Sequence, residues 1–390
     1  MNVARSREEF IEMFSDRITK ANQGLRQGKR LDLEQNLPKT YLVEAHRFRE
    51  QEPNHNTVLR FLRATLNAPR QMILETKDEF FFAVKLDNVI LYIDALETRF
   101  WLAHTLNRTL DADSSVESLI RDSPDLDSAW LPGKYLRGEK YGAVNERLGV
   151  RFDPVGSRLA PTEVPIPVEL QRPTSIEVEA PDIDYIWRVL LEDEKIRRRM
   201  PIVRTIVRRE FDESRYARIG LRYDGKITAR GPTYPEYIRL VTAIQATYAQ
   251  SIRQIEERYV LRWESVDGSE TGESPMVAEL RGAPISIEFT RPPIDTGMLI
   301  SWLLHPNGPC RLWGHVERVA PDYYSIEAVD MHSGDPLGIE LGVQGDAAFM
   351  RIYLAECACA NIVARLYTNT QQHVDPCARV YGGDGAELFW

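Results

Sequence analysis

A chain of 390 residues with 43% hydrophobic and 27% charged residues has the composition of a globular protein of two or three domains. Its formal net charge of −9 excludes a protein that coats nucleic acid over its whole surface. The sequence has no run of about 18 uncharged apolar residues, and its N-terminal stretch MNVARSREEFIEMF carries charges where a signal peptide needs an apolar core. We therefore expect a cytoplasmic protein that does not enter membranes.

The N-terminal part of the chain combines helical and strand patterns. Ser6 and Glu9 have the spacing of a capping box, which predicts the start of a helix. Residues 71–95 alternate apolar and polar side chains and predict an antiparallel meander of three strands. A helix with an inward apolar side is expected over 96–110. Residues 1–152 should therefore form an α+β domain that contains the meander.

Two stretches have the composition of connections between domains. Residues 153–173 contain five prolines, which fix φ and remove backbone donors, so we expect an extended connector. Residues 266–275, VDGSETGESP, have the composition of a flexible linker. These stretches separate a basic middle region at 174–265, which includes a hairpin and a long helix, from a C-terminal α+β domain at 276–390.

The longest helical pattern covers residues 233–260. It begins with a second capping box, at Thr233 and Glu236, and its apolar residues then recur every three or four positions. We expect one long central amphipathic helix. A final helix, apolar on nearly all sides, is predicted over 346–370. The predicted fold is a multi-domain α+β structure with small antiparallel or mixed sheets, each covered by helices.

The cysteines lie in the last fifth of the chain, at Cys310, Cys357, Cys359 and Cys377. Four cysteines in a chain of this length do not indicate a disulfide scaffold, so we expect free thiols. Cys357 and Cys359 fall on the predicted final helix, where two positions correspond to about 200° of rotation. They should not face one ion there, and we predict no metal site and no cofactor.

The most basic stretch lies between Lys195 and Arg230, with twelve lysines and arginines against four acidic residues. Within it, Asp224-Gly225 predicts the turn of a hairpin. Guanidinium groups match the paired oxygens of phosphate and carboxylate groups, so this stretch is expected to contact an anionic partner. The arginines assigned to the contact surface are Arg197, Arg198, Arg199, Arg204, Arg208, Arg209, Arg218, Arg222 and Arg230.

Three interpretations of this basic stretch remain open. The acidic stretch at 94–127 could neutralise it inside the molecule or across a subunit interface. The arginines could bind a protein partner or a second copy of the chain. They could also bind a nucleic acid, whose bases would stack on the interleaved tyrosines Tyr216, Tyr223 and Tyr234.

Motifs of P-loop NTPases, α/β-hydrolases, zincins and dinucleotide-binding enzymes are absent from the sequence. The closest approach to an acid–base cluster is Asp330, His332 and Asp335 in AVDMHSGDPLG. Asp330 and His332 share one side of a predicted strand, as a catalytic histidine–carboxylate pair would require. The same residues are also ordinary turn chemistry. His104 is expected to be a core residue and not a ligand.

Two functions follow from these observations. The first is a non-enzymatic binding or assembly component of an intracellular protein complex, which contacts its partner through the arginine-rich surface. In one version of this function, the complex acts on nucleic acid. The alternative is a hydrolytic enzyme of an uncommon type, with a nuclease-like enzyme as one version, and with Asp330, His332 and Asp335 of the C-terminal domain in its site. No motif in the sequence fixes a reaction.

Overall fold

The computed structural model describes residues 3–26, 37–49, 53–66, 71–154, 173–266, 277–290, 296–305, 308–344 and 347–389. Nearly all of the predicted connector at 153–173 and linker at 266–275 lies outside these residues. Packing divides the chain into two compact units, and neither is continuous in sequence. Unit 1 comprises Met1–Gly149, Glu177–Arg188 and Ile202–Ala249, and unit 2 comprises Val150–Ile176, Val189–Pro201 and Gln250–Trp390.

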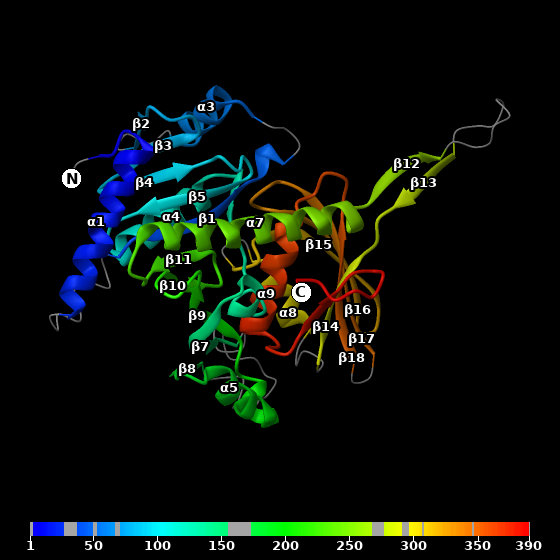
Figure 1. The fold of residues 1–390 in the computed structure, drawn as a ribbon. Helices are drawn as coiled ribbons and strands as arrows, with labels where there is room; N and C mark the ends of the chain where they lie inside the picture. Colours follow the sequence, from blue (N-terminus) through cyan, green and yellow to red (C-terminus); the bar gives the residue numbers. More distant parts are fainter. Residues whose placement is uncertain are drawn as a thin grey trace. The chain divides into compact units, whose positions relative to one another are not determined.

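An eleven-stranded sheet is the framework of unit 1 (Figure 1). Its strand order is β2-β3-β4-β5-β1-β11-β10-β9-β7-β8, and β6 pairs with β1 beside this path. The strands are β1 (Lys39–Ala45), β2 (Gln71–Glu75), β3 (Phe81–Leu86), β4 (Val89–Asp94), β5 (Phe100–Thr105), β6 (Leu126–Ser128), β7 (Val144–Phe152), β8 (Thr174–Glu179), β9 (Ile202–Glu210), β10 (Tyr216–Arg222) and β11 (Lys226–Ala229). The pairing of β1 with β11 joins two parts of the chain that are far apart in sequence.

The meander predicted over 71–95 is confirmed, because β2, β3 and β4 pair in succession. The hairpin predicted at Asp224-Gly225 is also confirmed: β10 and β11 pair antiparallel, and Gly225 has a φ of +76°, which glycine adopts without strain. The helix predicted over 96–110 is wrong, since Phe100–Thr105 forms strand β5 between β1 and β4. Every residue of β5 is buried, so its apolar run shows no strand alternation that the sequence could reveal.

Helices pack on both faces of this sheet. On the first face, Phe10 of α1 lies 5.2 Å from Phe81 between ring centroids, and Tyr248 of α7 lies 5.7 Å from Phe100. On the second face, α3 and α4 share one apolar cluster with β1, β3, β4 and β5. The bounds of these helices are α1 (Arg7–Arg26), α3 (His55–Thr65), α4 (Thr109–Asp122) and α7 (Tyr234–Tyr259), and two 3-10 helices are η1 (His46–Phe48) and η2 (Gly138–Tyr141).

The second face changes character along the sheet. In β10, Ala217, Ile219 and Leu221 are buried and lie on the first face of the sheet. Arg218, Gly220 and Arg222 alternate with them, are half-buried and lie on the second face. The part of the second face that α3 and α4 cover is apolar, whereas the part over β9, β10 and β11 carries arginine and threonine.

A six-stranded antiparallel sheet forms the core of unit 2, with the order β15-β16-β17-β18-β14-β19. Its strands are β14 (Ile285–Phe289), β15 (Leu312–Ala320), β16 (Tyr323–Asp330), β17 (Pro336–Gln344), β18 (Ala347–Leu354) and β19 (Arg379–Tyr381). A separate two-stranded hairpin consists of β12 (Arg262–Val266) and β13 (Val277–Arg281). The helices of unit 2 are α6 (Glu194–Arg197), α8 (Thr296–Leu303) and α9 (Asn361–His373). The residues of α5 (Ile183–Glu192) are divided between the two units.

The final helix predicted over 346–370 is wrong in its first half. Ala347–Leu354 is strand β18, in which buried and exposed residues alternate with the strand period of two. The helix of this segment, α9, begins only at Asn361, and it is buried on nearly all sides. Cys357 and Cys359 therefore precede the helix and do not lie on it.

Both units mix helices with antiparallel sheets, which agrees with an α+β class, but the predicted arrangement is wrong. The sheets are large, with eleven and six strands, where small sheets were expected. A helix covers the range predicted for the long helix, but it is not a single central element: α7 is one of several helices packed on sheets, and its residues are divided between the two units. Local patterns reveal strands, but not the distant pairings that merge them into one sheet.

Within the described residues, no helix is both long enough and apolar enough to cross a lipid bilayer.

Candidate functional site: a basic cavity on the sheet of unit 1

A cavity of about 760 Å³ lies on the second face of the unit 1 sheet, beside the first turn of α4. We call it the basic cavity, because six of its lining side chains are basic and two are acidic. The lining residues are Arg108, Thr109, Leu110, Asp111, Arg147, Gly149, Glu177, Arg204, Thr205, Ile206, Gly220, Leu221, Arg222, Lys226, Thr228 and Arg230.

The register of β9, β10 and β11 explains why basic residues gather here. Residues directly opposite one another project from the same face of a sheet and form rows across the strands. Read from β9 through β10 to β11, the rows are Arg204, Arg222 and Lys226, then Ile206, Gly220 and Thr228, then Arg208, Arg218 and Arg230. The middle row carries no charge, and the two basic rows are about 13 Å apart along the strands. The result is a shallow floor between two lines of cations.

Two glycines let arginine side chains lie across the sheet. A Cβ atom on Gly149 would stand 2.5 Å from Cγ of Arg204, and one on Gly220 would stand 3.2 Å from Nε of Arg230. Any larger residue at Gly149 would push the Arg204 side chain away from the strand. These glycines therefore help to set the positions of the two guanidinium groups at the cavity.

Ion pairs with partly exposed carboxylates hold several of these arginines. Arg204 lies 3.1 Å from Glu177 of β8, with side chains 55% and 39% exposed. Arg147 contacts Glu177 and Glu179, and Arg218 lies 2.5 Å from Glu146. Pairs with this exposure contribute about 0–1 kcal/mol each. A ligand with two or more negative charges can therefore compete with these carboxylates for the arginines.

A tighter network anchors α4 to the sheet at one side of the cavity. Asp113 accepts hydrogen bonds from the Tyr41 hydroxyl (2.5 Å), from Nζ of Lys226 (2.5 Å) and from Nη1 of Arg222 (3.2 Å). Burial by itself would raise the pKa of Asp113, but the Arg222 charge and the bonds from Lys226 and Tyr41 outweigh it, so this pKa is lowered. Asp113 is therefore a carboxylate that positions Lys226 and Arg222.

The structure separates the nine arginines that the sequence assigned to one surface. Arg204, Arg222 and Arg230 line the basic cavity, and Arg208 and Arg218 project from the same face of the sheet. Arg209 has the opposite strand parity, and its guanidinium group lies 5.2 Å from the ring centroid of Phe211. The remaining three belong to unit 2, in α6 and the residues that follow it: Arg197, Arg198 and Arg199.

Sequence reasoning missed three basic residues of the cavity: Arg108, Arg147 and Lys226. Arg147 comes from β7, far from the basic stretch in sequence, and only the sheet order brings it beside β9. Lys226 lies inside the basic stretch, and its position directly after Asp224-Gly225 marks it as the first residue of a returning strand. That turn signal was sufficient to find Lys226.

The expectation that acidic residues 94–127 neutralise the basic stretch receives limited support from the described ion pairs. From that segment, Asp113 pairs with Arg222 and Lys226. Other carboxylates that hold these arginines come from elsewhere in the chain: Glu146, Glu177, Glu179, Glu210 and Asp224. Several charges of the basic stretch are thus satisfied within the molecule. Glu210 and Asp224 belong to the stretch itself, whereas Glu146, Glu177 and Glu179 are partners that the sequence did not indicate.

The tyrosines proposed for base stacking already contact other rings or cations. The guanidinium group of Arg208 lies 4.2 Å from the ring centroid of Tyr216, and Tyr223 lies 6.1 Å from Trp130. Tyr234 is 2% exposed and packs against Phe10. No aromatic residue occurs among the described side chains that line the cavity. This arrangement favours recognition of charge over stacking on bases.

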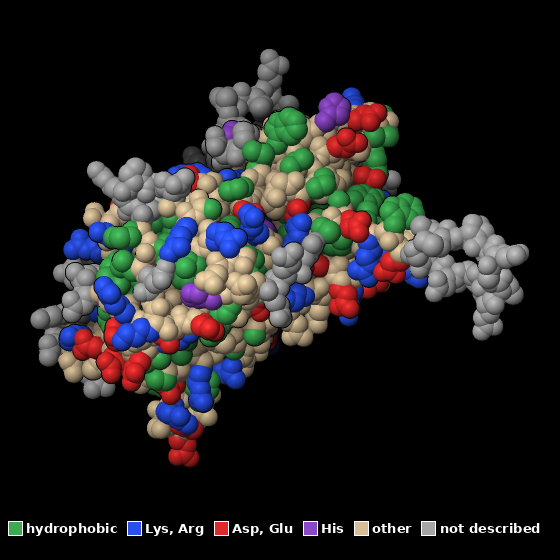
Figure 2. Space-filling view, turned by 90° about the horizontal axis from the view of Figure 1, so that it is seen from above, with side chains coloured by type: hydrophobic (Ala, Val, Ile, Leu, Met, Phe, Trp, Pro, Cys, Tyr) green, Lys and Arg blue, Asp and Glu red, His purple; other side chains and the backbone are tan. Residues whose placement is uncertain are grey.

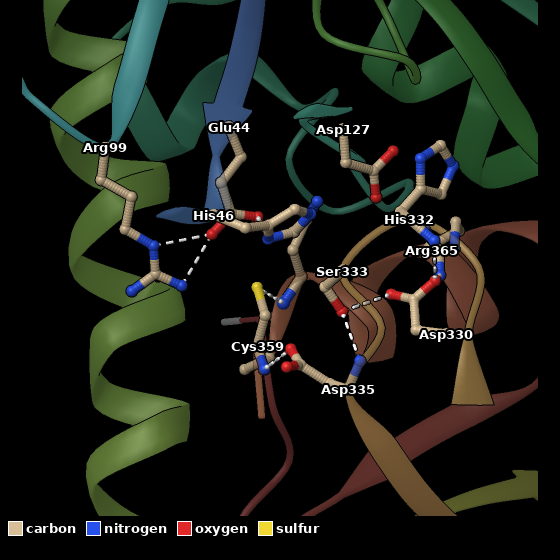
Figure 3. Close-up of polar contacts among 12 residues, drawn as sticks. Glu44, His46, Arg99, Asp127, Asp330, His332, Ser333, Asp335, Cys359 and Arg365 are labelled. Carbon is tan, nitrogen blue, oxygen red and sulfur yellow. Dashed lines mark hydrogen bonds and ion pairs between the residues drawn. The ribbon is translucent and has the colours of Figure 1, made fainter. Parts of the chain in front are cut away.

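The second candidate cluster, at Asp330, His332 and Asp335, lies in the turn between β16 and β17 of unit 2 (Figure 3). Asp330 is 2% exposed and pairs at 2.5 Å with Arg365 of α9, which is fully buried. Asp330 Oδ1 also accepts the backbone N–H of His332 at 3.0 Å. The Asp330 carboxylate therefore satisfies a buried arginine and closes a turn.

The imidazole of His332 faces Arg311, whose Nη1 lies 3.0 Å from Nε2. Asp335 accepts the backbone N–H of Cys359 at 3.2 Å, so its carboxylate supports the segment before α9 (Figure 3). Each of the three side chains therefore has a structural partner.

Comparison with known proteins assigns the chain to a family. The family model described as MJECL33-like protein matches residues 1–389, and the chain therefore belongs to this family. It is similar to "Uncharacterized protein MJECL33" of Methanocaldococcus jannaschii, with 22% identity over 408 residues. The match covers 95% of this chain and 92% of the archaeal protein, so the similarity extends over both units.

Proposed function

We propose that this protein is a binding protein whose ligand carries phosphate groups, and that these groups enter the basic cavity of unit 1. The observation that carries the proposal is the row arrangement of Arg204, Arg222 and Lys226, with Arg147 from the neighbouring β7. Guanidinium groups match phosphate oxygens in pairs, and neighbouring strands place such groups about 5 Å apart. A phosphate-bearing ligand could therefore contact two arginines at once.

The first turn of α4 adds donors at the edge of the cavity. Thr109, Leu110 and Asp111 line it, and the N-cap residue Arg108 provides no side-chain capping bond. The first turn of an α-helix leaves backbone N–H groups without partners inside the helix, and these groups favour anions. The carboxylate of Asp111 works against this contribution, so the sheet arginines carry the larger share of the proposed interaction.

The size and chemistry of the cavity favour small phosphorylated groups over stacked bases. A volume of about 760 Å³ falls in the range of ligand-binding cavities. The tyrosines once expected to stack bases are engaged elsewhere. The ligand chemistry we propose is therefore the phosphate group itself, carried either by a small molecule or by the backbone of a nucleic acid.

A binding role is favoured over hydrolysis. Asp330 is held by Arg365 and by its own turn, and the His332 imidazole faces a guanidinium group, so these two side chains already have structural partners. From the sequence we also expect a component of a cytoplasmic protein complex, and we keep that role as part of this proposal. The residues of the arginine-rich stretch that line the cavity support this role.

Binding of defined probes tests the proposal. Inorganic pyrophosphate and a short single-stranded oligonucleotide of mixed sequence would be titrated into the purified chain by calorimetry and by fluorescence anisotropy, at low and moderate salt. We expect Arg204→Gln combined with Arg230→Gln to weaken binding about tenfold or more, which corresponds to about 1.4 kcal/mol. Binding should also weaken with salt.

Arg262→Gln serves as the matched control, because Arg262 is also paired with a glutamate, at 2.7 Å, and is 40% exposed, but lies on β12 of unit 2. Binding of pyrophosphate but not of the oligonucleotide indicates a small phosphorylated ligand. Binding of the oligonucleotide but not of pyrophosphate indicates a nucleic acid backbone. Equal binding by the native chain and the double variant would rule out the cavity as the binding site.

A further inference from the structure

Strand β15 forms one edge of the six-stranded sheet of unit 2. It is nine residues long, and within the described part of the chain it pairs only with β16. Trp313 and Val319 on this strand are 64% and 58% exposed, which is unusual for large apolar side chains. A long exposed edge strand with apolar side chains is a template for pairing with another strand.

The backbone groups available for such pairing can be identified from the neighbouring ladders. In β16, the N–H of Asp330 donates to Asp335 on the β17 side, and the N–H of Met331 donates to Arg311 on the β15 side. Backbone groups alternate in direction along an antiparallel strand. Odd-numbered residues of β15 therefore bond to β16, and the even-numbered residues Gly314 and Val316 direct their N–H and C=O groups away from the sheet.

The sequence of β15 is complementary to itself when two copies run antiparallel about Val316. Gly314 then lies opposite the second copy's residue 318, and Val316 lies opposite its own equivalent, so the outward backbone groups form a ladder. His315 then faces Glu317 of the other copy. In this pair the imidazole N–H can donate a hydrogen bond to the glutamate carboxylate across the two strands, which favours strand pairing.

We propose that β15 is the contact by which two copies of this chain associate, so that two six-stranded sheets continue into one another through Val316. The choice of a second copy rests on this self-complementarity: the two-fold arrangement places each His315, a hydrogen-bond donor, opposite a glutamate carboxylate and places no like charges directly opposite one another. The regular ladder with β16 shifts register between Arg318 and Ala320, so the paired segment extends from Gly314 to Arg318.

A segment of this length makes a small interface, and small interfaces are weak or transient. We therefore expect a monomer–dimer equilibrium in the micromolar range. This association is independent of the basic cavity, because all residues involved belong to unit 2.

Val316→Pro is the decisive variant. Proline removes the outward N–H of residue 316, while the bonds from β15 to β16 remain, and proline is tolerated on an edge strand for this reason. Val316→Thr is the matched control, since it keeps the N–H and the branched shape. Sedimentation velocity across about 1 to 200 µM should show dimer formation by the native chain and the threonine variant, with at least tenfold weaker association of the proline variant.

A charge exchange provides a second test that does not depend on proline being accommodated. Glu317→Lys places a cation opposite His315 of the other copy and should weaken the dimer several-fold, whereas adding His315→Glu to the same chain should restore it. A native chain that stays monomeric over the whole range would overturn the proposal. It would equally be overturned if Val316→Pro dimerised as the native chain does, or if the exchanged pair were no better than Glu317→Lys alone.

Discussion

Arginine–carboxylate pairs occur in both units, and they differ mainly in how much water reaches them. At the basic cavity, Arg204 and Glu177 are 55% and 39% exposed, whereas in unit 2 the pair of Arg365 and Asp330 is 0% and 2% exposed. Water weakens the attraction of the first pair and allows its partners to exchange. The second pair has no alternative partner in water, so separating its members leaves a buried charge.

This difference separates the proposed binding surface from a structural element, although both use the same residue types. The sequence places both sets of charges in motifs that look functional, the basic stretch and the Asp330 cluster. Burial withdraws the pair of Asp330 and Arg365 from water, whereas the pair of Arg204 and Glu177 at the basic cavity remains partly exposed. Charged side chains also lie on other surfaces: Figure 2 shows one face of the described residues, where basic and acidic side chains are interspersed.

The largest expected effect comes from breaking the buried pair. Arg365→Met leaves the Asp330 carboxylate buried without its cation, which should lower the free energy of unfolding by about 3–5 kcal/mol. Urea denaturation followed by circular dichroism measures this change. Arg351→Met is the control, because Arg351 is 46% exposed and lies 3.7 Å from Glu340. Equal destabilisation by the two variants would contradict the idea that burial makes the Arg365–Asp330 pair the more important one for stability.

A buried histidine extends the same reasoning to unit 1. His104 is 1% exposed, and its Nδ1 lies 2.7 Å from the Thr40 hydroxyl, as expected for a core residue. Burial lowers the pKa of His104 to about 4, and the Asp94 charge opposes this only in part. The unfolded chain binds this proton near pH 6.5, so stability should fall as the pH drops from about 6.5 to 4, by about 3 kcal/mol.

The free energy of unfolding measured across this pH range checks the effect of His104. His104→Gln removes the titrating group, and it should reduce the slope between pH 6.5 and 4 even if it lowers stability at neutral pH. If the variant showed the native slope, a different group would have to account for it.

A smaller effect is expected at Asp113, whose side chain is 17% exposed and therefore intermediate between the two pairs. Its pKa is lowered, so its contribution to stability is present above the unfolded value of about 3.9 and is lost as the pH falls below it. Asp113→Asn should cost about 1–2 kcal/mol at neutral pH, by weakening the bonds to Lys226 and Arg222. The free energies of unfolding of the two proteins should converge as the pH falls below about 3.9, and a difference that stays constant would argue against the assignment.

The smallest effect on stability belongs to Glu177, in the exposed pair. Glu177→Gln should change the free energy of unfolding by less than about 1 kcal/mol. The same substitution removes a carboxylate that competes for Arg147 and Arg204, so pyrophosphate affinity should rise about threefold if the cavity binds phosphate. Thermal unfolding and calorimetric titration of one preparation give both values. A drop in affinity would show that Glu177 supports the site and does not compete with the ligand.

Some features of the fold were readable from the residues themselves. The alternation over 71–95 gave the meander, and Asp224-Gly225 gave the hairpin that carries Arg222 and Lys226 to the cavity. The capping pattern at Ser6 is present, since the N–H of Glu9 donates to the Ser6 hydroxyl at 3.2 Å. These features depend on interactions between near neighbours, which a local pattern encodes.

Other features escaped the same reasoning because their cause is distant in sequence. Residues 100–105 lack alternation, since β5 is buried on both faces between β1 and β4. Arg147 belongs to the cavity only because β7 lies next to β9 in the sheet. The pairing of Arg365 with Asp330 could not be inferred from the sequence, because Asp330 lies in a turn 35 residues earlier in the chain.

The sequence alone determined the presence of strands and helices in an α+β chain and the concentration of arginine between residues 195 and 230. The tertiary structure decided how strands join into sheets of eleven and six, which arginines share a face, and which carboxylates are withdrawn from water. The physical reason is that periodicity records which side of an element is buried, whereas strand order and the desolvation of a charge depend on surfaces that meet only in the folded chain.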